Sequence, residues 1–300
     1  MVSFPPKGLV LIPGRPETGL LTPGAVRGLV ERLALRPSKR LGQNFVVDPG
    51  IVRRIVAAAR LEPNERVIEV GPGLGSLTLG LLEAGASVVA VEYDTILAAA
   101  LPETIAQRSD PPPGLGDRFD LVRGDALEVE ALPGRAASAM VANLPYSVAT
   151  KVLLRFLERF DSIRHALVMV QSEVAARLVA GPGSRVYGLP SAKLAWCASA
   201  RPAGHVPRNA FFPVPRVDSE LVYLERHQPP ATVSRAAVFE LIDAAFAMRR
   251  KTLRVALAGH SGGAGRAEAA LVRAGIDPMA RGETLSIEQF ARLAEELSRD

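Results

Sequence analysis

The pattern of hydrophobic and polar positions changes twice along the 300-residue chain. Residues 1–21 carry repeated Pro and Gly without periodicity, so we expect a loose extension there. Apolar residues then recur at helical spacing in two stretches, 23–35 and 50–61. Thr22 and Asp48 each stand before a proline, which is the form of an N-cap followed by proline at the first helical position. They predict two helix starts.

From residue 66 the pattern becomes a regular alternation of short β-rich runs and amphipathic stretches. We expect strands at 66–70, 87–93, 119–125, 136–146 and 165–170. We expect helices at 76–85, 94–106, 149–160 and 171–180, and a Pro/Gly loop at 111–116. This βαβ rhythm predicts a mostly parallel sheet with helices on both faces.

The rhythm ends after residue 180. Two strand-like stretches, 194–206 and 219–227, have no helix between them, so the sheet is expected to end in an antiparallel last strand. Beyond residue 228 the pattern is helical only, with helices expected at 233–258, 267–276 and 286–297. The sequence therefore predicts three parts: an N-terminal extension with a short helix (1–35), a larger α/β domain (36–228) and a small all-helical domain (229–300).

A glycine-rich loop follows the first strand of the alternating region. Gly71, Gly73 and Gly75 allow a ligand to approach the backbone closely. Glu92 ends the next strand, where a carboxylate can accept both hydroxyls of a ribose. A dinucleotide fold normally has a glycine at the position of Ser76. The spacing G-x-G-x-G is instead usual in enzymes that use S-adenosylmethionine, which indicates that cofactor.

Two further polar residues end the next two strands. Asp125 could accept a hydrogen bond from an adenine amino group, although a helix N-cap explains it equally well. Asn143, in the stretch VANLPYS, could be a simple turn residue. Ligands of open α/β sheets bind at the carboxyl ends of the strands, where Gly71, Glu92, Asp125 and Asn143 are expected to converge. Asn143 is therefore a candidate active-site residue that faces the cofactor.

Composition and charge add only a little to this picture. The chain is 48% hydrophobic and 22% charged, which is ordinary for a globular protein, and no apolar run approaches the ~18 residues of a membrane span. The single cysteine, Cys197, excludes an internal disulfide and fits a reducing cytosol. The four histidines are scattered, so we expect no metal site. A net charge of +5 is compatible with a polyanionic partner.

The chain resembles the small-subunit (16S) ribosomal RNA adenine N6-dimethyltransferases from about residue 36 to its C-terminus. The blocks that carry the resemblance occur in family order: LGQNFVVD (41–48), VIEVGPGLGSLT (67–78), VEYD (91–94), GDAL (124–127), VANLPYSV (141–148), MVQSEVAARL (169–178), FFPVPRVDS (211–219), FAMRRKTL (246–253) and RGETLSIEQF (281–290). The stretch N-L-P-Y is typical of enzymes that methylate an exocyclic amine.

The resemblance implies a Rossmann-like class I methyltransferase fold with a helical RNA-recognition domain. It also implies the activity: dimethylation, from S-adenosylmethionine, of two adjacent adenines near the 3′ end of 16S rRNA. The enzyme is then expected to act as a cytoplasmic monomer on immature small subunits, without metal or membrane. Three alternatives remain: a 23S rRNA methyltransferase that confers antibiotic resistance, a non-catalytic RNA-binding assembly factor, and a nicotinamide dehydrogenase. The glycine spacing and N-L-P-Y disfavour the last two.

The family pattern also assigns site residues. By likeness, the cofactor contacts are Asn44, Val46, Gly71, Glu92, Asp125 and Asn143. The catalytic residues are Asn143, Leu144, Pro145, Tyr146 and Phe211. Val46 stands where the family usually has Leu, and Tyr93 where a small aliphatic residue is commoner.

The chemistry of an adenine amine explains these residue types. Its lone pair is delocalised into the ring, so it needs positioning more than a strong base. The carbonyl of Asn143 can accept one N–H, and a main-chain carbonyl near Pro145 the other, which also disperses the developing positive charge. Tyr146 and Phe211 are expected to stack on the two faces of the extruded base.

Two basic clusters are expected to contact RNA phosphates. The first is Arg36, Lys39 and Arg40, and the second is Arg249, Arg250, Lys251 and Arg254. In the second cluster Arg250 and Arg254 are expected one turn apart on one helix, where they repel each other unless an anion lies between them.

Overall fold

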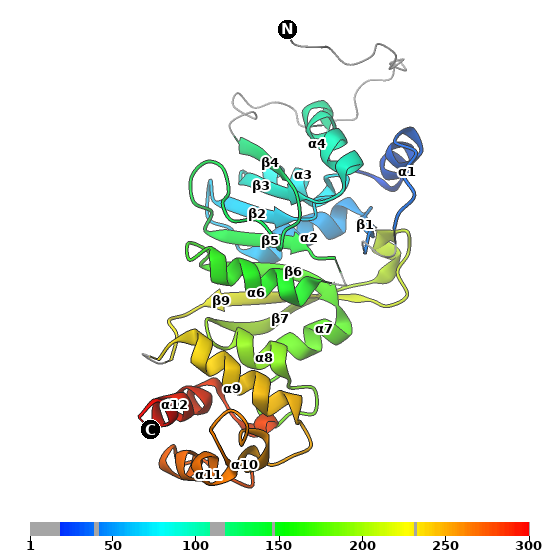
Figure 1. Ribbon diagram of the computed structural model, residues 1–300. Helices are drawn as coiled ribbons and strands as arrows, with labels where there is room; N and C mark the ends of the chain where they lie inside the picture. The colour runs from blue at the N-terminus through cyan, green and yellow to red at the C-terminus, as the bar shows by residue number, and fades with distance from the viewer. Residues whose placement is uncertain (1–18, 39–41, 109–117, 146–147, 231–232, 300) are drawn as a thin grey trace.

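A mostly parallel sheet with helices on both faces forms the larger part of the molecule, and a helical domain adjoins one edge of it (Figure 1). The computed structural model describes residues 19–38, 42–108, 118–145, 148–230 and 233–299. Within these ranges no helix is long and apolar enough to cross a membrane.

Seven strands form the main sheet in the order β4-β3-β2-β5-β6-β9-β7. Their bounds are β2 (Arg66–Val70), β3 (Ser87–Glu92), β4 (Phe119–Arg123), β5 (Ala139–Asn143), β6 (His165–Gln171), β7 (Ala198–Val206) and β9 (Ser219–Arg226). The first five are parallel, β9 is antiparallel to β6, and β7 is antiparallel to β9. The predicted parallel sheet with an antiparallel end is therefore confirmed. The order reverses beside β2, which is where open α/β sheets bind ligands.

A second sheet of two short antiparallel strands was not predicted. β1 (Phe45–Val46) pairs with β8 (Phe211–Phe212), with Val46 opposite Phe211. The main-chain N–H of Val47 extends the contact by donating to the Ala210 carbonyl over 2.9 Å. This pairing fixes the segment that precedes the first βαβ unit against the loop between β7 and β9.

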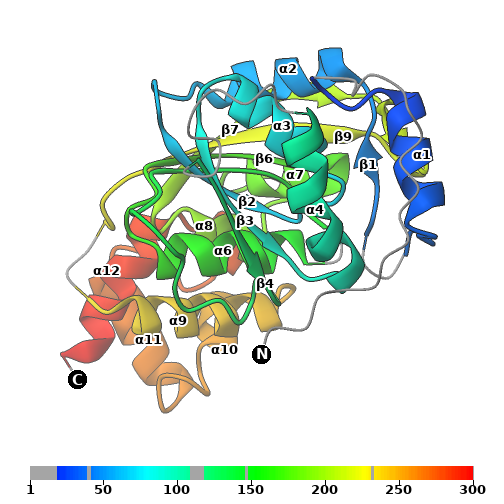
Figure 2. The ribbon, with the colours of Figure 1, turned by 90° about the horizontal axis from the view of Figure 1, so that it is seen from above.

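Helices cover both faces of the main sheet (Figure 2). Their bounds are α1 (Pro23–Arg32), α2 (Pro49–Ala59), α3 (Ser76–Glu83), α4 (Thr95–Arg108), α6 (Ala149–Arg159), α7 (Ser172–Leu178) and α8 (Leu189–Leu194). Both predicted helix starts are confirmed, since Thr22 caps α1 by accepting the Ala25 N–H and Asp48 caps α2 by accepting the Gly50 N–H. The short helix α8 was not predicted, because its six residues lie within a stretch rich in Gly and Pro.

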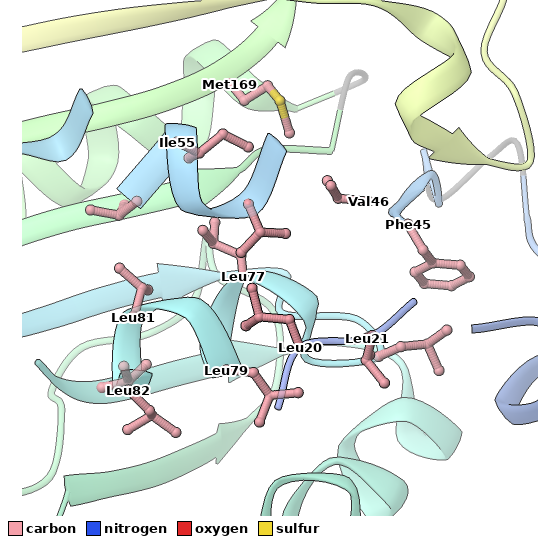
Figure 3. Close-up of a cluster of buried hydrophobic side chains, with 14 of the residues drawn as sticks. Leu20, Leu21, Phe45, Val46, Ile55, Leu77, Leu79, Leu81, Leu82 and Met169 are labelled. Carbon is pink, nitrogen blue, oxygen red and sulfur yellow. The ribbon is translucent and has the colours of Figure 1, made fainter. Parts of the chain in front are cut away.

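The last residues of the N-terminal extension pack against the core, although the sequence pattern indicated a loose extension up to residue 21. Leu20 and Leu21 are 7% and 0% exposed and belong to the same core as Phe45 and Leu77 (Figure 3). The expectation of a loose extension over residues 1–21 is therefore wrong for its last residues. The main-chain N–H of Gly19 donates to the carbonyl of the last residue of α4 over 2.7 Å. Residues 1–18 lie outside the described part of the chain.

The helical domain contains α9 (Arg235–Ala247), α10 (Leu253–Ala256), α11 (Ala264–Arg273) and α12 (Ile287–Ser298), with a 3₁₀ turn at Gly282–Thr284. The continuous helix expected over 233–258 is wrong, because the chain turns at 248–252 between α9 and α10. Residues before and within α8 also join this domain's core, among them Tyr187 and Trp196. The Tyr187 hydroxyl donates to the Leu285 carbonyl over 3.0 Å. The helical core is therefore completed by residues that precede the proposed boundary at 228.

Two helical glycines allow a matched test of the packing between α2 and α3. A Cβ on Gly80 of α3 would overlap Val52 of α2, whereas a Cβ on Gly28 of α1 would meet no atom within 4 Å. We expect Gly80→Ala to lower the free energy of unfolding by about 1–3 kcal/mol through overpacking. Gly28→Ala should raise it by up to about 1 kcal/mol through helix propensity. Urea denaturation measures both, and an increase in stability in Gly80→Ala would contradict this packing.

Candidate active site at the strand ends

A cavity of about 360 Å³ opens at the carboxyl ends of β2, β3 and β5. Residues 42–46 form another part of its lining. All six residues that the family likeness assigned to the cofactor line this one cavity: Asn44, Val46, Gly71, Glu92, Asp125 and Asn143. The structure thus brings together residues that are up to 99 positions apart in the sequence.

The glycine loop between β2 and α3 has a backbone that only glycine adopts easily. Gly71, Gly73 and Gly75 have φ angles of 71°, 60° and 93°. A Cβ on Gly73 would lie 3.0 Å from the Phe45 ring, and one on Gly75 would lie 2.8 Å from Leu101. The glycines therefore supply both the left-handed conformation and the space that the neighbouring side chains occupy.

Glu92 is buried at the end of β3 and accepts hydrogen bonds on both carboxylate oxygens. Its Oε2 accepts the Gly73 N–H over 3.0 Å, and its Oε1 accepts the Asp94 N–H over 2.8 Å. Burial raises the pKa of this carboxyl, and the two backbone bonds partly offset that effect. Each oxygen retains a second lone pair, so the group can still accept hydrogen bonds from a ligand in the cavity.

Asp125 lies after β4, where the sequence left open a helix N-cap and an adenine contact. Its Oδ1 accepts the Leu127 N–H over 2.9 Å and so stabilises the turn after β4, as a capping residue does. No described helix starts there, so the bond closes a turn and is not a helix N-cap. Asp125 also lines the cavity, so the adenine contact stays a prediction for this residue.

The side chain of Asn143 is oriented by the opposite wall of the cavity. Its Nδ2 donates to the main-chain carbonyl of Asn44 over 3.1 Å. The donor end of the amide is therefore engaged, which leaves the acceptor, Oδ1, for a ligand. The next residue, Leu144, has a buried side chain in the core, and its N–H donates to the Met169 carbonyl over 3.1 Å. Leu144 is therefore not among the residues that line the cavity, although it was predicted as a catalytic residue.

The remaining predicted catalytic residues differ in their placement. Pro145 lines the cavity, and its carbonyl accepts the Val148 N–H over 3.1 Å. Tyr146 lies outside the described residues. Phe211 is 2% exposed and packs in the core behind β1, so the structure does not bring it to the cavity surface as expected. The pairing of β8 with β1 accounts for this, since it turns Phe211 towards the interior.

The sequence reasoning missed Glu69, a carboxyl group in the middle of β2. It is 1% exposed, lines the cavity, and its Oε2 accepts the Thr78 hydroxyl over 2.6 Å. Burial, reinforced by repulsion from Glu92, raises the pKa of Glu69 to about 8. The available signal was an acidic residue inside a run of buried apolar residues, which is rare without a functional or structural reason.

The second basic cluster, called the tail cluster below, comprises Arg249, Arg250, Lys251 and Arg254, and its arrangement differs from the prediction. Arg249 donates to Glu283 and to the carbonyls of Arg185 and Tyr187, and Arg254 pairs with Glu268 at 3.1 Å. Arg250 lies in the turn between α9 and α10, so it does not share a helix with Arg254 and the expected repulsion is wrong. Arg250 and Lys251 are exposed. In the other cluster, Lys39 and Arg40 lie outside the described residues.

Comparison with known proteins decides the family. Residues 35–299 match the family model described as ribosomal RNA adenine dimethylase. The chain belongs to the ribosomal RNA adenine dimethylase family. Two curated relatives, from Streptomyces coelicolor and Kineococcus radiotolerans, are each 58% identical over 278 residues. The matches cover 92% of this chain and 96% and 91% of the relatives, and both are named ribosomal RNA small subunit methyltransferase A.

Two solved structures share the fold of this chain. A dimethyladenosine transferase from Plasmodium falciparum is 21% identical, with a TM-score of 0.69 over 84% of this chain and 96% of that one, and it shows the shared fold. The 23S rRNA methyltransferase ErmE is 28% identical, with a TM-score of 0.60 over 85% of this chain and 100% of that one. This rRNA adenine dimethylase therefore has the class I methyltransferase fold that was predicted. No group of three or more potential metal ligands occurs among the residues with described coordinates.

The buried Glu69 predicts a specific pH dependence of stability. Between its reference pKa of 4.5 and its folded pKa of about 8, the folded protein retains a proton that the unfolded chain releases. The contribution of Glu69 to stability therefore falls as pH rises through this window. Glu69→Gln keeps an acceptor for Thr78 and does not ionise, so its melting temperature should fall less than that of the wild type between pH 5 and pH 8. The exposed Glu128→Gln is the control, and parallel curves for Glu69→Gln and the wild type would refute the assignment.

Proposed function

We propose that this rRNA adenine dimethylase transfers methyl groups from S-adenosylmethionine to the N6 amines of two adjacent adenines near the 3′ end of 16S rRNA. It dimethylates each adenine in an immature small subunit, in the cytoplasm and as a monomer. The observation that carries the proposal is the Asn143 amide, whose donor end is bound to the Asn44 carbonyl at the edge of the cavity. The names of the relatives at 58% identity support the small subunit as the target.

The residues of the cavity fit S-adenosylmethionine. Two buried carboxyl groups, Glu69 and Glu92, line it, and burial raises the pKa of each. A positive charge in the cavity would stabilise their ionised forms, so a cationic ligand is favoured there. We assign the ribose hydroxyls to Glu92 and the adenine amino group to Asp125, and both residues line the cavity together with Asn44, Val46 and Gly71. When bound, the cofactor supplies an activated methyl group on a sulfonium.

The protein's contribution to the reaction is to hold the adenine amine. Oδ1 of Asn143 accepts one of its N–H bonds, because Nδ2 is already directed at Asn44. A main-chain carbonyl beside Pro145 accepts the other. The Pro145 carbonyl is bonded to Val148, so the Leu144 carbonyl is the better candidate. Two fixed acceptors orient the nitrogen and stabilise the positive charge that develops on it.

The prediction that two aromatic side chains stack on the extruded base has to be revised. Tyr146 remains the proposed stacking surface, since it follows Pro145 directly. Phe211 is buried and instead supports the cavity wall, because it pairs with Val46 across the β1–β8 sheet. The stacking energy, roughly 1–3 kcal/mol per base, is then supplied from one face by Tyr146.

A 23S rRNA target is the second candidate, and the structural likeness to ErmE is the observation that favours it. The identity of 28% to ErmE is far below the 58% to the small-subunit relatives. The two targets are separated by mass spectrometry of 16S and 23S rRNA after incubation with enzyme and cofactor.

Replacement of Asn143 tests the proposed function. We expect Asn143→Ala to reduce transfer of labelled methyl groups to immature small subunits by about 10²–10³-fold, as loss of a charge-stabilising acceptor does. Binding of S-adenosylhomocysteine, measured by calorimetry, should weaken much less. Mass spectrometry should find dimethyladenosine in 16S rRNA with the wild type only. Full activity of the variant would contradict the mechanism, and product in 23S rRNA alone would contradict the target.

The exposed residues of the tail cluster, Arg250 and Lys251, lead to a separate prediction about RNA binding. We expect Arg250→Ala/Lys251→Ala to reduce the slope of log affinity against log salt concentration by up to about 2, because each lost phosphate contact removes roughly 0.7–0.9. A matched double variant on α2, Arg53→Ala/Arg54→Ala, removes the same charge away from the tail. Equal slopes in the two double variants would exclude the tail from the RNA interface.

A further inference from the structure

The side chain of Gln43 connects two segments that are 51 residues apart. Its Nε2 donates to Oδ2 of Asp94 over 2.9 Å, and its Oε1 accepts the Ser38 N–H over 2.8 Å. The main-chain N–H of Gln43 also donates to the Ser38 carbonyl over 3.2 Å. Both ends of the side-chain amide are engaged, so the orientation of Gln43 is determined.

Asp94 is a rigid acceptor for this bond. Its Oδ1 accepts the N–H groups of Ile96 and Leu97, at 2.9 and 3.2 Å, at the start of α4. Its own N–H donates to Oε1 of Glu92 over 2.8 Å. The carboxylate that receives Gln43 is therefore fixed by a helix N-terminus and lies next to the residue proposed to bind the cofactor ribose.

On the other side, Gln43 adjoins the carbonyl that orients the catalytic amide. Asn44 is the next residue, and its carbonyl accepts Nδ2 of Asn143 over 3.1 Å. The following residues, Phe45 and Val46, are held by β8. The Asn44 carbonyl is thus fixed from its C-terminal side by strand pairing and from its N-terminal side by the bond between Gln43 and Asp94.

The five residues from both segments, Gly42 to Asn44 together with Tyr93 and Asp94, line the same cavity. The bond between Gln43 and Asp94 therefore joins two parts of its wall. Without this bond, the hydrogen bonds described on the N-terminal side of Asn44 go to nearby residues of the same segment, Ser38 and Gly42. The Asn44 carbonyl is then less well fixed, and so is the direction in which Asn143 presents its acceptor to the adenine amine.

We propose that Gln43 is a positioning residue for methyl transfer: through Asp94 it fixes the Asn44 carbonyl, which in turn directs Oδ1 of Asn143 towards the adenine amine. This inference rests on the proposed role of Asn143. It assigns no contact between Gln43 and the transferred methyl group.

Donor and acceptor can be exchanged across this bond, which gives a rescue experiment. Gln43→Glu places two carboxylates face to face, and Asp94→Asn places two amide donors face to face, so each single variant loses the bond. The double variant Gln43→Glu/Asp94→Asn restores it with the direction reversed. The introduced Asn still caps α4, and the introduced Glu still accepts the Ser38 N–H.

The control is Gln107→Ala. The Gln107 side chain also donates to a carboxylate, Glu103, over 2.8 Å, but on an exposed face of α4. In single-turnover assays with saturating cofactor and immature small subunits, we expect Gln43→Ala and both single exchange variants to lower the rate at least about 10-fold. Because cofactor is saturating, this loss is separate from any change in the dissociation constant for S-adenosylhomocysteine, which is measured for each variant. The double variant should regain most of the rate, and Gln107→Ala should match the wild type.

Hydrogen exchange provides a readout that does not depend on activity. In the cofactor-free protein, Gln43→Ala should accelerate amide exchange in residues 42–44 and leave the helix α4 beyond its first turn unchanged. Melting temperatures identify a temperature at which every variant is folded, and all assays are run there.

Three results would overturn the inference: an unchanged rate in Gln43→Ala, additive losses in the double exchange variant, or unchanged exchange in residues 42–44. A different failure would concern the proposed function. If the wild type itself transfers no methyl group to small subunits, the activity assignment fails, while hydrogen exchange still tests whether Gln43 fixes the segment.

Discussion

The active site depends on one hydrogen bond, from Nδ2 of Asn143 to the main-chain carbonyl of Asn44. An asparagine amide has a donor end and an acceptor end, and adenine methylation needs the acceptor. A main-chain carbonyl can only accept, so it selects the orientation that leaves Oδ1 available. Because the two residues are 99 positions apart, this selection requires that β5 and the β1 segment be assembled together. The fold thereby determines the chemistry of a single side chain.

Electrostatics imposes the second constraint. Glu69 and Glu92 are both buried at the cavity, where burial raises the pKa of each and makes their ionised forms costly without a nearby positive charge. The hydrogen bonds from Thr78 and Gly73 offset part of this cost in the protein alone. A cation in the cavity would offset more of it. The same group that makes the protein less stable at high pH thus favours a positively charged cofactor.

The regular strands, the glycine loop and both early helix caps were predictable because local sequence patterns determine them. Features that depend on distant contacts were not. β1 and β8 have two residues each and form only by pairing across the chain, so no periodicity reveals them or the burial of Phe211. Likewise, the ion pairs of Arg249 and Arg254 require partners from other parts of the helical domain. Four of the six cofactor positions, Gly71, Glu92, Asp125 and Asn143, were expected at the strand ends, whereas Asn44 and Val46 came from family likeness alone. The structure explains why all six converge.

The most direct test of this account is the orientation of the Asn143 side chain, determined by neutron diffraction from deuterated crystals with S-adenosylhomocysteine bound. Neutrons distinguish the ND₂ group from the carbonyl oxygen, which X-rays at ordinary resolution do not. We expect the two deuterons on the atom that faces the Asn44 carbonyl, with the oxygen directed into the cavity. Deuterons on the atom that faces the cavity would contradict the account, because Asn143 would then present a donor to the adenine amine.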